Sequence, residues 1–355
     1  MICTGQLRTE PEAAYKTIQS NVRQIFGDRF LVLFQEGTPG KPVFVMVANP
    51  QLTPEGQLLD RAPDKPLIGL ILAGLSFISA TWAGCEILRQ TLKPTQIIWT
   101  DGISYACAWM GFFLVRELGH YFMAKRYRLP VTLPYFFPFP PVAPFPPIGT
   151  LGAYTRLLAP MPSRKALFDI RAIGSLGGMA LAIGLLAWGL AHSTVVLESD
   201  RATIFDFEGL KPKYSLLLAL LTKVALGTQI GAKQAIALHP VAFAGWLGVL
   251  FSAFNLMPIG TLDGGRLVHA VYGQRTGAMI GNVARLLLLL LSLAQMHLVL
   301  WAVLLFFLPT MDEPALNDVT EVNGVRDMIC LVALVLVMLV ILPAPPSLLV
   351  ALGMG

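Results

Sequence analysis

Charged residues are scarce in this chain of 355 residues, at 13% of the total. A soluble domain carries about 25% charged residues, so the composition excludes an ordinary soluble globular protein. The four cysteines show no close spacing, which excludes a disulfide framework or a cysteine-rich metal site. Hydrophobic residues are abundant: they make up 55% of the chain, and the mean hydropathy is +0.65. Most of the chain is therefore expected to lie in lipid.

Long apolar runs predict the membrane-spanning helices, because a helix needs about 20 apolar residues to cross a bilayer. Spans are predicted at about 66–88, 102–123, 173–193, 238–259 and 327–344, with two further helices sharing the run 277–308. The run at 214–227 is too short to span easily and is expected at the interface. The predicted fold class is an all-α polytopic membrane protein of about five to seven transmembrane helices, with a small α+β N-terminal region.

Lysine and arginine are concentrated between residues 125 and 171. This segment contains seven of them and one acidic residue, Asp169. Because these residues favour the cytoplasmic side of a membrane, this segment is predicted to be cytoplasmic. The net charge of +5 follows from the same bias. The sequence contains no basic segment with interleaved aromatic residues, which is the pattern that would indicate a nucleic-acid partner.

The first 60 residues are the only part with the composition of a soluble region. A helix is expected around 11–26, and strands are expected at 29–35 and 42–48. About 60 residues form only a marginal core alone, so this region is expected to rest on the rest of the chain. The predicted division is a small α+β region at 1–60, a linker at 61–65, a membrane-embedded domain at 66–345 and a C-terminal tail at 346–355.

The segment 129–147 is dense in proline and phenylalanine, which excludes a regular helix. It is followed by a run with β character at 148–157. A loop and a strand beside a membrane helix suit pairing with an extended peptide. A plain interfacial loop fits the same pattern, so both interpretations stay open.

Residues 116–120 read Arg-Glu-Leu-Gly-His. This is the helical zinc-protease pattern His-Glu-x-x-His with arginine in place of the first histidine. In the intact pattern, two imidazoles on one helix face bind Zn²⁺ and the glutamate activates water. A guanidinium has no lone pair and stays protonated, so Arg116 repels a divalent cation.

A second candidate half-site is Asp263, which ends the sequence Asn255-Leu-Met-Pro-Ile-Gly-Thr-Leu-Asp at the predicted cytoplasmic end of an apolar span. An unpaired carboxylate at this depth is costly, and an intramembrane ionisable group is functional by default. The helix with Glu117 and His120 is predicted to end on the same side of the membrane. The two half-sites are therefore expected to meet.

With both half-sites in view, the chain resembles the site-2 proteases, the M50 family of intramembrane zinc metalloproteases, and most closely their cyanobacterial and chloroplast-type branch. The resemblance covers about two-thirds of the chain, over residues 115–345. The segments that carry it are 117–126, 163–169, 239–248, 255–258, 262–265, 273–277 and 312–318.

This resemblance implies that His120 and Asp263 are zinc ligands, that Glu117 is the general base, and that Asn255 contacts the substrate backbone. A ligand role is not carried over to Arg116, so the first ligand position is disrupted. The resemblance further implies a multi-pass protein of a bacterial, cyanobacterial-type plasma or thylakoid membrane. Its implied substrates or partners are single-span transmembrane proteins.

The other histidines are poor replacements for the missing zinc ligand. His239 lies 24 residues before Asp263, which is about 36 Å along a continuous helix at 1.5 Å per residue. His192 and His297 fall at the outer ends of their predicted spans. His269 follows Asp263 by six residues, and its helix would have to turn back to reach the site.

Two functions follow as hypotheses. The first is a catalytically impaired homologue, a pseudoprotease, that binds single-span partners or lipids while Arg116 pairs with Asp263 or Glu117 in place of the metal. The alternative is an active intramembrane zinc metalloprotease of regulated intramembrane proteolysis, in which Arg116 swings away and water or His269 completes the metal site. A transporter would predict inverted repeats or paired broken helices, and the sequence contains neither.

Overall fold

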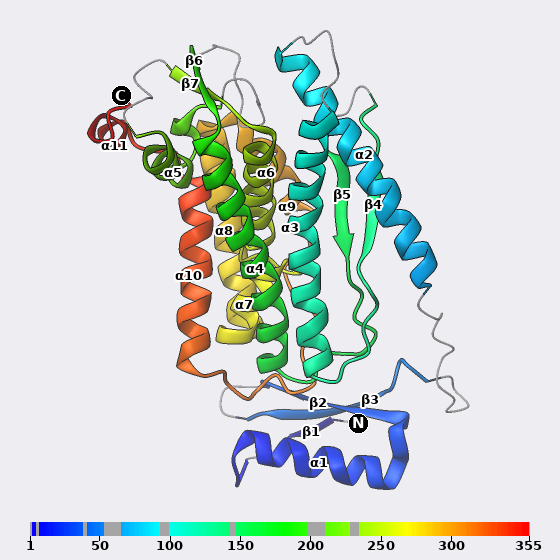
Figure 1. The fold of residues 1–355 in the computed structure, drawn as a ribbon. Coiled ribbons are helices and arrows are strands. Elements are labelled where there is room, and N and C mark those ends of the chain that lie inside the picture. Colours follow the sequence, from blue (N-terminus) through cyan, green and yellow to red (C-terminus); the bar gives the residue numbers. More distant parts are fainter. Residues whose placement is uncertain are drawn as a thin grey trace.

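The structure is a computed structural model that describes residues 2–4, 7–37, 41–52, 65–92, 99–142, 147–197, 210–227 and 234–354. After the N-terminal region, its helices are α2 (Pro66–Leu92), α3 (Trp99–Arg126), α4 (Arg164–Ala191), α5 (Leu216–Leu226), α6 (Pro240–Asn255), α7 (Asp263–Tyr272), α8 (Gln274–Ala294), α9 (Val299–Phe306), α10 (Gly324–Ile341) and α11 (Pro346–Ala351). The long helices form a bundle with the N-terminal region beneath it (Figure 1). The predicted helical membrane fold with a small sheet region is confirmed.

Four of the described helices are long and apolar enough to cross a membrane, by length and composition: the part of α2 at Pro66–Ile87, and α4, α8 and α10. The sequence predicted about five to seven transmembrane helices, so the number that meets these criteria is lower. The difference arises because α6 has only 16 residues and α3 carries polar residues of the site. The run at 277–308 does divide into two helices, but α9 has 8 residues and is too short to span.

Helix α4 lies at the centre of the bundle and packs closely on α3 and α6. Glycines allow α4 and α6 to approach each other closely where they cross. A Cβ added to Gly189 of α4 would lie 2.3 Å from the nitrogen of Ala242, and one added to Gly245 of α6 would lie 2.4 Å from the nitrogen of Leu186. Small residues let helix backbones approach within a membrane, where packing rather than the hydrophobic effect drives helix association.

A β-hairpin stands beside α2 and α3 (Figure 1). It consists of β4 (Tyr135–Phe139) and β5 (Gly149–Tyr154), paired antiparallel with a shift of register between Phe137 and Pro138. Proline has no N–H for the ladder, which accounts for an irregularity at this point. β4 lies within the segment where a helix was excluded, and β5 confirms the β character of 148–157. A second antiparallel pair, β6 (Thr194–Leu197) and β7 (Gln234–Ala237), lies at the opposite end of the bundle from the N-terminal region.

The N-terminal region is a three-stranded antiparallel sheet covered on one side by α1 (Pro11–Phe26). The strand order is β1 (Ile2–Thr4), β3 (Val43–Ala48) and β2 (Phe30–Gln35). Tyr15 of α1 packs on the ring of Phe34 in β2, and burial raises the pKa of Tyr15 to about 12. These elements agree with the predicted helix and strands. The predicted linker lies outside the described residues except for Lys65, so the division into domains stays a prediction.

Backbone hydrogen bonds join this sheet to the membrane region. The Phe34 N–H donates to the carbonyl oxygen of Leu316 over 2.7 Å, and the Asp318 N–H donates to the Phe34 carbonyl oxygen over 2.8 Å. The segment 316–318 also contacts the residues before α4, because the Asn317 N–H donates to the Pro162 carbonyl oxygen over 3.1 Å. Residues 316–318 are thus inserted between β2 and the start of α4. The small sheet rests on the membrane region, as its limited core requires.

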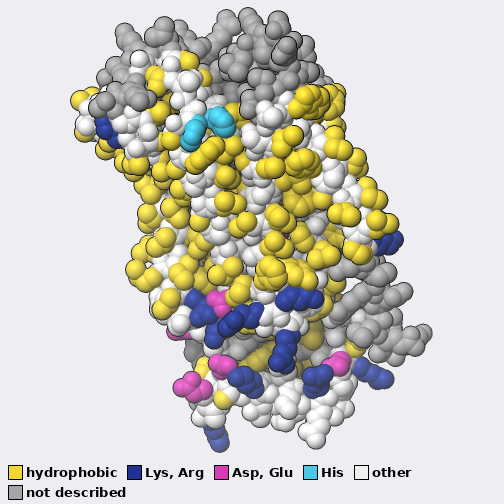
Figure 2. Space-filling model, in the orientation of Figure 1, with side chains coloured by type: hydrophobic (Ala, Val, Ile, Leu, Met, Phe, Trp, Pro, Cys, Tyr) yellow, Lys and Arg dark blue, Asp and Glu magenta, His cyan; other side chains and the backbone are white. Residues whose placement is uncertain are grey.

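The distribution of side chains on the surface agrees with a membrane position. Figure 2 shows hydrophobic side chains over the middle of the bundle, and Lys and Arg side chains gathered at the end next to the N-terminal region. This end contains the basic segment after α3. It is the end expected to face the cytoplasmic side.

Gly245→Val is expected to lower the melting temperature of the detergent-purified protein, because the added side chain would overlap the α4 backbone at Leu186. Overpacking of this kind costs about 1–3 kcal/mol. Circular dichroism during heating measures the effect. Gly184→Ala is the matched control, since open space surrounds that position on α4. Equal melting of Gly245→Val and the native chain would contradict the close crossing of α4 and α6.

Candidate functional site

The site is built from two segments that are distant in the sequence. Arg116, Glu117 and His120 lie on one face of α3, because positions three and four apart in a helix are neighbours. Asp263 is the first residue of α7, directly after the turn that follows α6. All four are buried, with 8%, 2%, 5% and 4% of their surfaces exposed, in that order. The structure therefore brings together the residues that the two sequence patterns singled out.

Arg116 lies between the two carboxylates. Its Nη1 donates a short hydrogen bond to Oε1 of Glu117, and its Nη2 donates a short hydrogen bond to Oδ2 of Asp263. The guanidinium carbon also lies 5.6 Å from the centre of the Phe251 ring, within the range of a cation–π contact. The Arg116 guanidinium thus bridges two buried acids, and an aromatic face fixes its position.

Three further residues complete the hydrogen bonds of these carboxylates. Ser175 of α4 donates its hydroxyl to Oδ2 of Asp263 over 2.6 Å, and Nη1 of Arg171 lies 3.3 Å from Oδ1 of the same residue. The Thr155 N–H, which follows β5, donates to Oε2 of Glu117 over 2.9 Å. Both oxygens of each acid are therefore engaged. None of these three residues was predicted as part of the site.

Glycines of α4 make room for the site residues of α3. A Cβ on Gly174 would lie 1.9 Å from Cδ2 of His120, and one on Gly178 would lie 3.1 Å from Cβ of Arg116. Any larger residue at 174 would have to displace the His120 ring. The run Gly-Ser-Leu-Gly-Gly at 174–178 was therefore a signal that α4 belongs to the site, although its spacing alone does not show which helix it contacts.

The residues do not fit a zinc ion in this arrangement. Nε2 of His120 is buried and has no hydrogen-bond partner, so it is a free ligand atom. It lies 4.0 Å from Oδ2 of Asp263, but that oxygen already accepts hydrogen bonds from Arg116 and Ser175. Catalytic zinc takes three protein ligands, and the described residues contain no group of three histidine, cysteine or acidic residues that could hold a metal.

The remaining histidines lie elsewhere. Nε2 of His269 is 2.8 Å from Oδ1 of Asp318, and its Nδ1 is 4.0 Å from Oδ2 of Asp312, so its ring is turned to the segment that supports the N-terminal sheet. His192 and His239 lie near each other, with ring centres 6.2 Å apart, beside β6 and β7. The ring of His297 packs on Tyr214. None of these four lines the cavity at the site.

A cavity of about 560 Å³ opens beside the two acids. Its wall includes Asn255, whose amide donates to the Phe251 carbonyl oxygen over 2.9 Å, and Thr155 at the end of β5. Arg171 and Arg266 add positive charge, and Arg266 Nε lies 3.1 Å from Oδ2 of Asp312. The structure thus places Asn255 beside the site. No observation tests its predicted contact with substrate, or the predicted roles of Glu117, His120 and Asp263.

Comparison with known proteins adds a family match. The family model described as "Peptidase family M50" matches residues 104–299. The probable zinc metalloprotease EGY1, chloroplastic, of Arabidopsis thaliana is 33% identical over 69% of this chain and 44% of its own length. Its namesake in Oryza sativa subsp. japonica is 28% identical over 99% of this chain and 64% of its own length. The probable zinc metalloprotease EGY2, chloroplastic, of Arabidopsis thaliana is 27% identical over 96% of this chain and 60% of its own length.

The chain thus spans less than two thirds of the length of these relatives. Their names place them in chloroplasts, which conflicts with the bacterial membrane expected from the sequence. The membrane character itself is supported by the apolar helices. No solved structure matches the chain.

Arg116→Ala is expected to lower thermal stability strongly, because it leaves Glu117 and Asp263 buried without their shared cation. Removing one partner of a buried ion pair costs about 3–5 kcal/mol. The melting temperature in detergent measures the loss. The control is Arg23→Ala, which removes an exposed ion pair with Asp28 on α1 and should change little. If the two variants melt alike, Arg116 does not hold the site together.

Proposed function

The chain belongs to peptidase family M50, and on that basis we propose that it is a site-2 protease homologue without proteolytic activity, which binds membrane partners. The observation that carries this proposal is the position of the Arg116 guanidinium between Glu117 and Asp263. In the family these acids serve a zinc ion. Here a fixed cation takes its place and needs no metal to compensate them.

Arginine also opposes catalysis directly. A general base must have a free oxygen within reach of the water proton that it takes. The two oxygens of Glu117 are held by Arg116 and by the Thr155 N–H. Zinc in a protease activates water and stabilises the oxyanion, and Arg116 can generate no hydroxide because it never gives up its proton. The residues of this chain are therefore suited to hold a peptide segment rather than to cut it.

The cavity supports binding of an extended segment. Thr155 lies next to the end of β5, and Asn255 lies in the same wall. A strand end and an amide side chain supply donors and acceptors for a peptide backbone. Single-span transmembrane proteins fit this class of partner, since a segment that enters the cavity from the bilayer must first unwind. The names of the relatives favour a chloroplast membrane as the location.

An active zinc protease is the second candidate, and two observations favour it. The relatives are named probable zinc metalloproteases. Glu117 and His120 also lie close together, with Oε1 and Nδ1 3.8 Å apart. This candidate requires Arg116 to leave its two acids and its place beside Phe251. It also requires a third ligand, for which His269 is unsuited because its ring contacts Asp318.

A cleavage assay separates the two candidates. The full-length chain in liposomes is expected to leave a single-span fluorogenic reporter uncut, and Glu117→Gln is expected to change nothing. Arg116→His restores the zinc-protease pattern and is expected to gain cleavage that a further Glu117→Gln removes. Cleavage by the native chain that Glu117→Gln abolishes would overturn the proposal and establish the protease.

A further inference from the structure

A further charged residue, which the site does not use, lies within one of the candidate membrane spans. Arg285 is the twelfth of the 21 residues of α8, one of the four candidate spans. At 1.5 Å per residue it is about 16 Å from the first residue of the helix. One turn earlier, a Cβ on Gly281 would lie 2.8 Å from the Pro258 carbonyl oxygen, in the loop that leads to Asp263. Arg285 is therefore at least as deep in the bundle as that loop.

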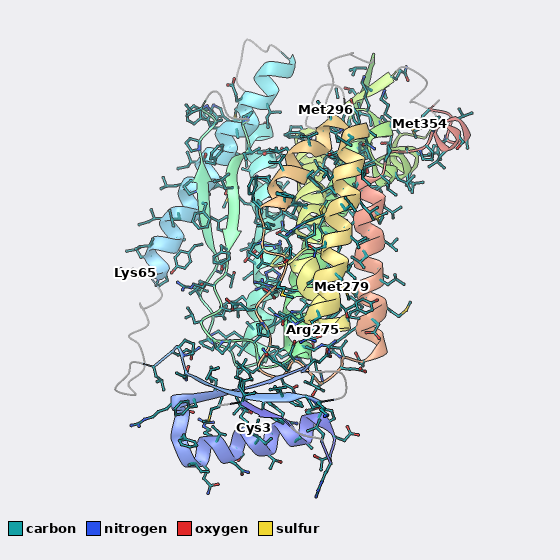
Figure 3. The ribbon with its side chains drawn as sticks, turned by 180° about the vertical axis from the view of Figure 1, so that it is seen from behind. Cys3, Lys65, Arg275, Met279, Met296 and Met354 are labelled. Carbon is teal, nitrogen blue, oxygen red and sulfur yellow. The ribbon has the colours of Figure 1, made fainter. Side chains whose placement is uncertain are left out.

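Arg285 lies at the edge of the outward face of α8, beside the stripe of Gly281, Leu288 and Ser292 that packs into the bundle. Figure 3 shows α8 on the outer surface of the bundle, rising from Arg275 and Met279 towards Met296. The side chain of Arg285 is partly exposed, among strongly exposed apolar neighbours. Leu286 and Leu289 follow it on the same helix, and Phe306 and Phe307 directly precede Leu308, the residue that Arg285 contacts. Such a surface is suited to lipid tails or to another transmembrane helix.

The charge of Arg285 has no counter-ion among the described residues. Its Nη2 donates to the Leu308 carbonyl oxygen over 2.5 Å, and its Nε is buried without a hydrogen-bond partner. The carbonyl lies just after the end of α9, where backbone oxygens lack partners within the helix. This bond orients the guanidinium but does not neutralise it. An uncompensated charge in a bilayer is costly, and such residues typically pair with another ionisable group.

We propose that the outer face of α8 around Arg285 binds a transmembrane helix of a partner protein that carries an aspartate or glutamate at the same depth. A carboxylate can accept two parallel hydrogen bonds from a guanidinium, which neutralises the charge and sets the depth and rotation of the incoming helix. The apolar neighbours then pack along it. This surface is separate from the cavity beside Asp263, so the inference goes beyond the proposed function and does not depend on it.

A second copy of the chain does not fit this surface. Across a symmetric contact it would bring a second Arg285 against the first. The acids whose side chains the structure describes on the long helices are Glu86, Glu117, Asp169 and Asp327. Glu117 and Asp169 are paired with arginines of their own chain, while Glu86 and Asp327 lie near the ends of their spans. None of these described acids is suited to pair with Arg285 of a second copy, so the proposal places the carboxylate on a different protein.

The test uses the full-length chain in nanodiscs of neutral phosphatidylcholine. The probe is a labelled leucine-alanine transmembrane peptide with lysine ends and one central glutamate, and its match has glutamine at that position. Energy transfer measures association at neutral pH. The glutamate peptide is expected to bind about tenfold more tightly than the glutamine peptide. Arg285→Gln is expected to abolish this preference, whereas the control Arg275→Gln, at the cytoplasmic end of α8, is expected to keep it.

Three results would overturn the inference. In the first, the native chain binds both peptides equally, a comparison that needs no variant and so does not depend on how Arg285→Gln folds. In the second, phosphatidylglycerol added to the nanodiscs removes the preference at an Arg285-dependent site, which would mean that a lipid headgroup rather than a protein carboxylate is the counter-ion. Persistence of the preference in a folded Arg285→Gln protein would contradict it as well.

Discussion

The ion pairs of Arg116 with Glu117 and Asp263 are the interaction on which the rest of the site depends. Two carboxylates from distant parts of the chain are buried at one point of a helix bundle, and water cannot compensate them there. A cation must therefore be present whenever the bundle is closed. A metal ion would supply it in a zinc protease, whereas in this chain a side chain of α3 supplies it. The chain thus compensates these two acids with one of its own side chains.

Several neighbouring elements support this ion-pair cluster through close packing and hydrogen bonds. Glycines of α4 let α3 approach closely enough for His120 and Arg116 to reach α7, and Ser175 of α4 supplies a hydrogen bond to Asp263. Thr155, the residue after β5, donates its backbone N–H to Glu117. Below the site, residues 316–318 connect the N-terminal sheet to the start of α4. The packing of α3, α4, α7 and β5 thus converges on one ion-pair network that links these elements to one another.

Hydropathy and local patterns predicted the helical membrane fold, the hairpin strand after the proline-rich segment, and the helix and strands of the N-terminal region. The meeting of Glu117 and His120 with Asp263 followed from the charge bias of the loops, which put both half-sites at one side of the membrane. Fewer helices than predicted have the length and composition of a span, because α6 has only 16 residues, α9 has 8 residues and α3 carries polar residues of the site. Arg171, Ser175 and Thr155 were missed because their contacts depend on how α4 and β5 pack, which no local pattern encodes.

The most direct test of the central claim is the zinc content of the full-length chain purified in detergent, measured beside Arg116→His. If Arg116 has taken the place of the metal, the native chain carries essentially no zinc. The histidine variant, with three protein ligands, then carries about one ion per chain. About one zinc in the native chain would contradict the claim, because it would mean that Arg116 does not occupy the site in the protein as purified.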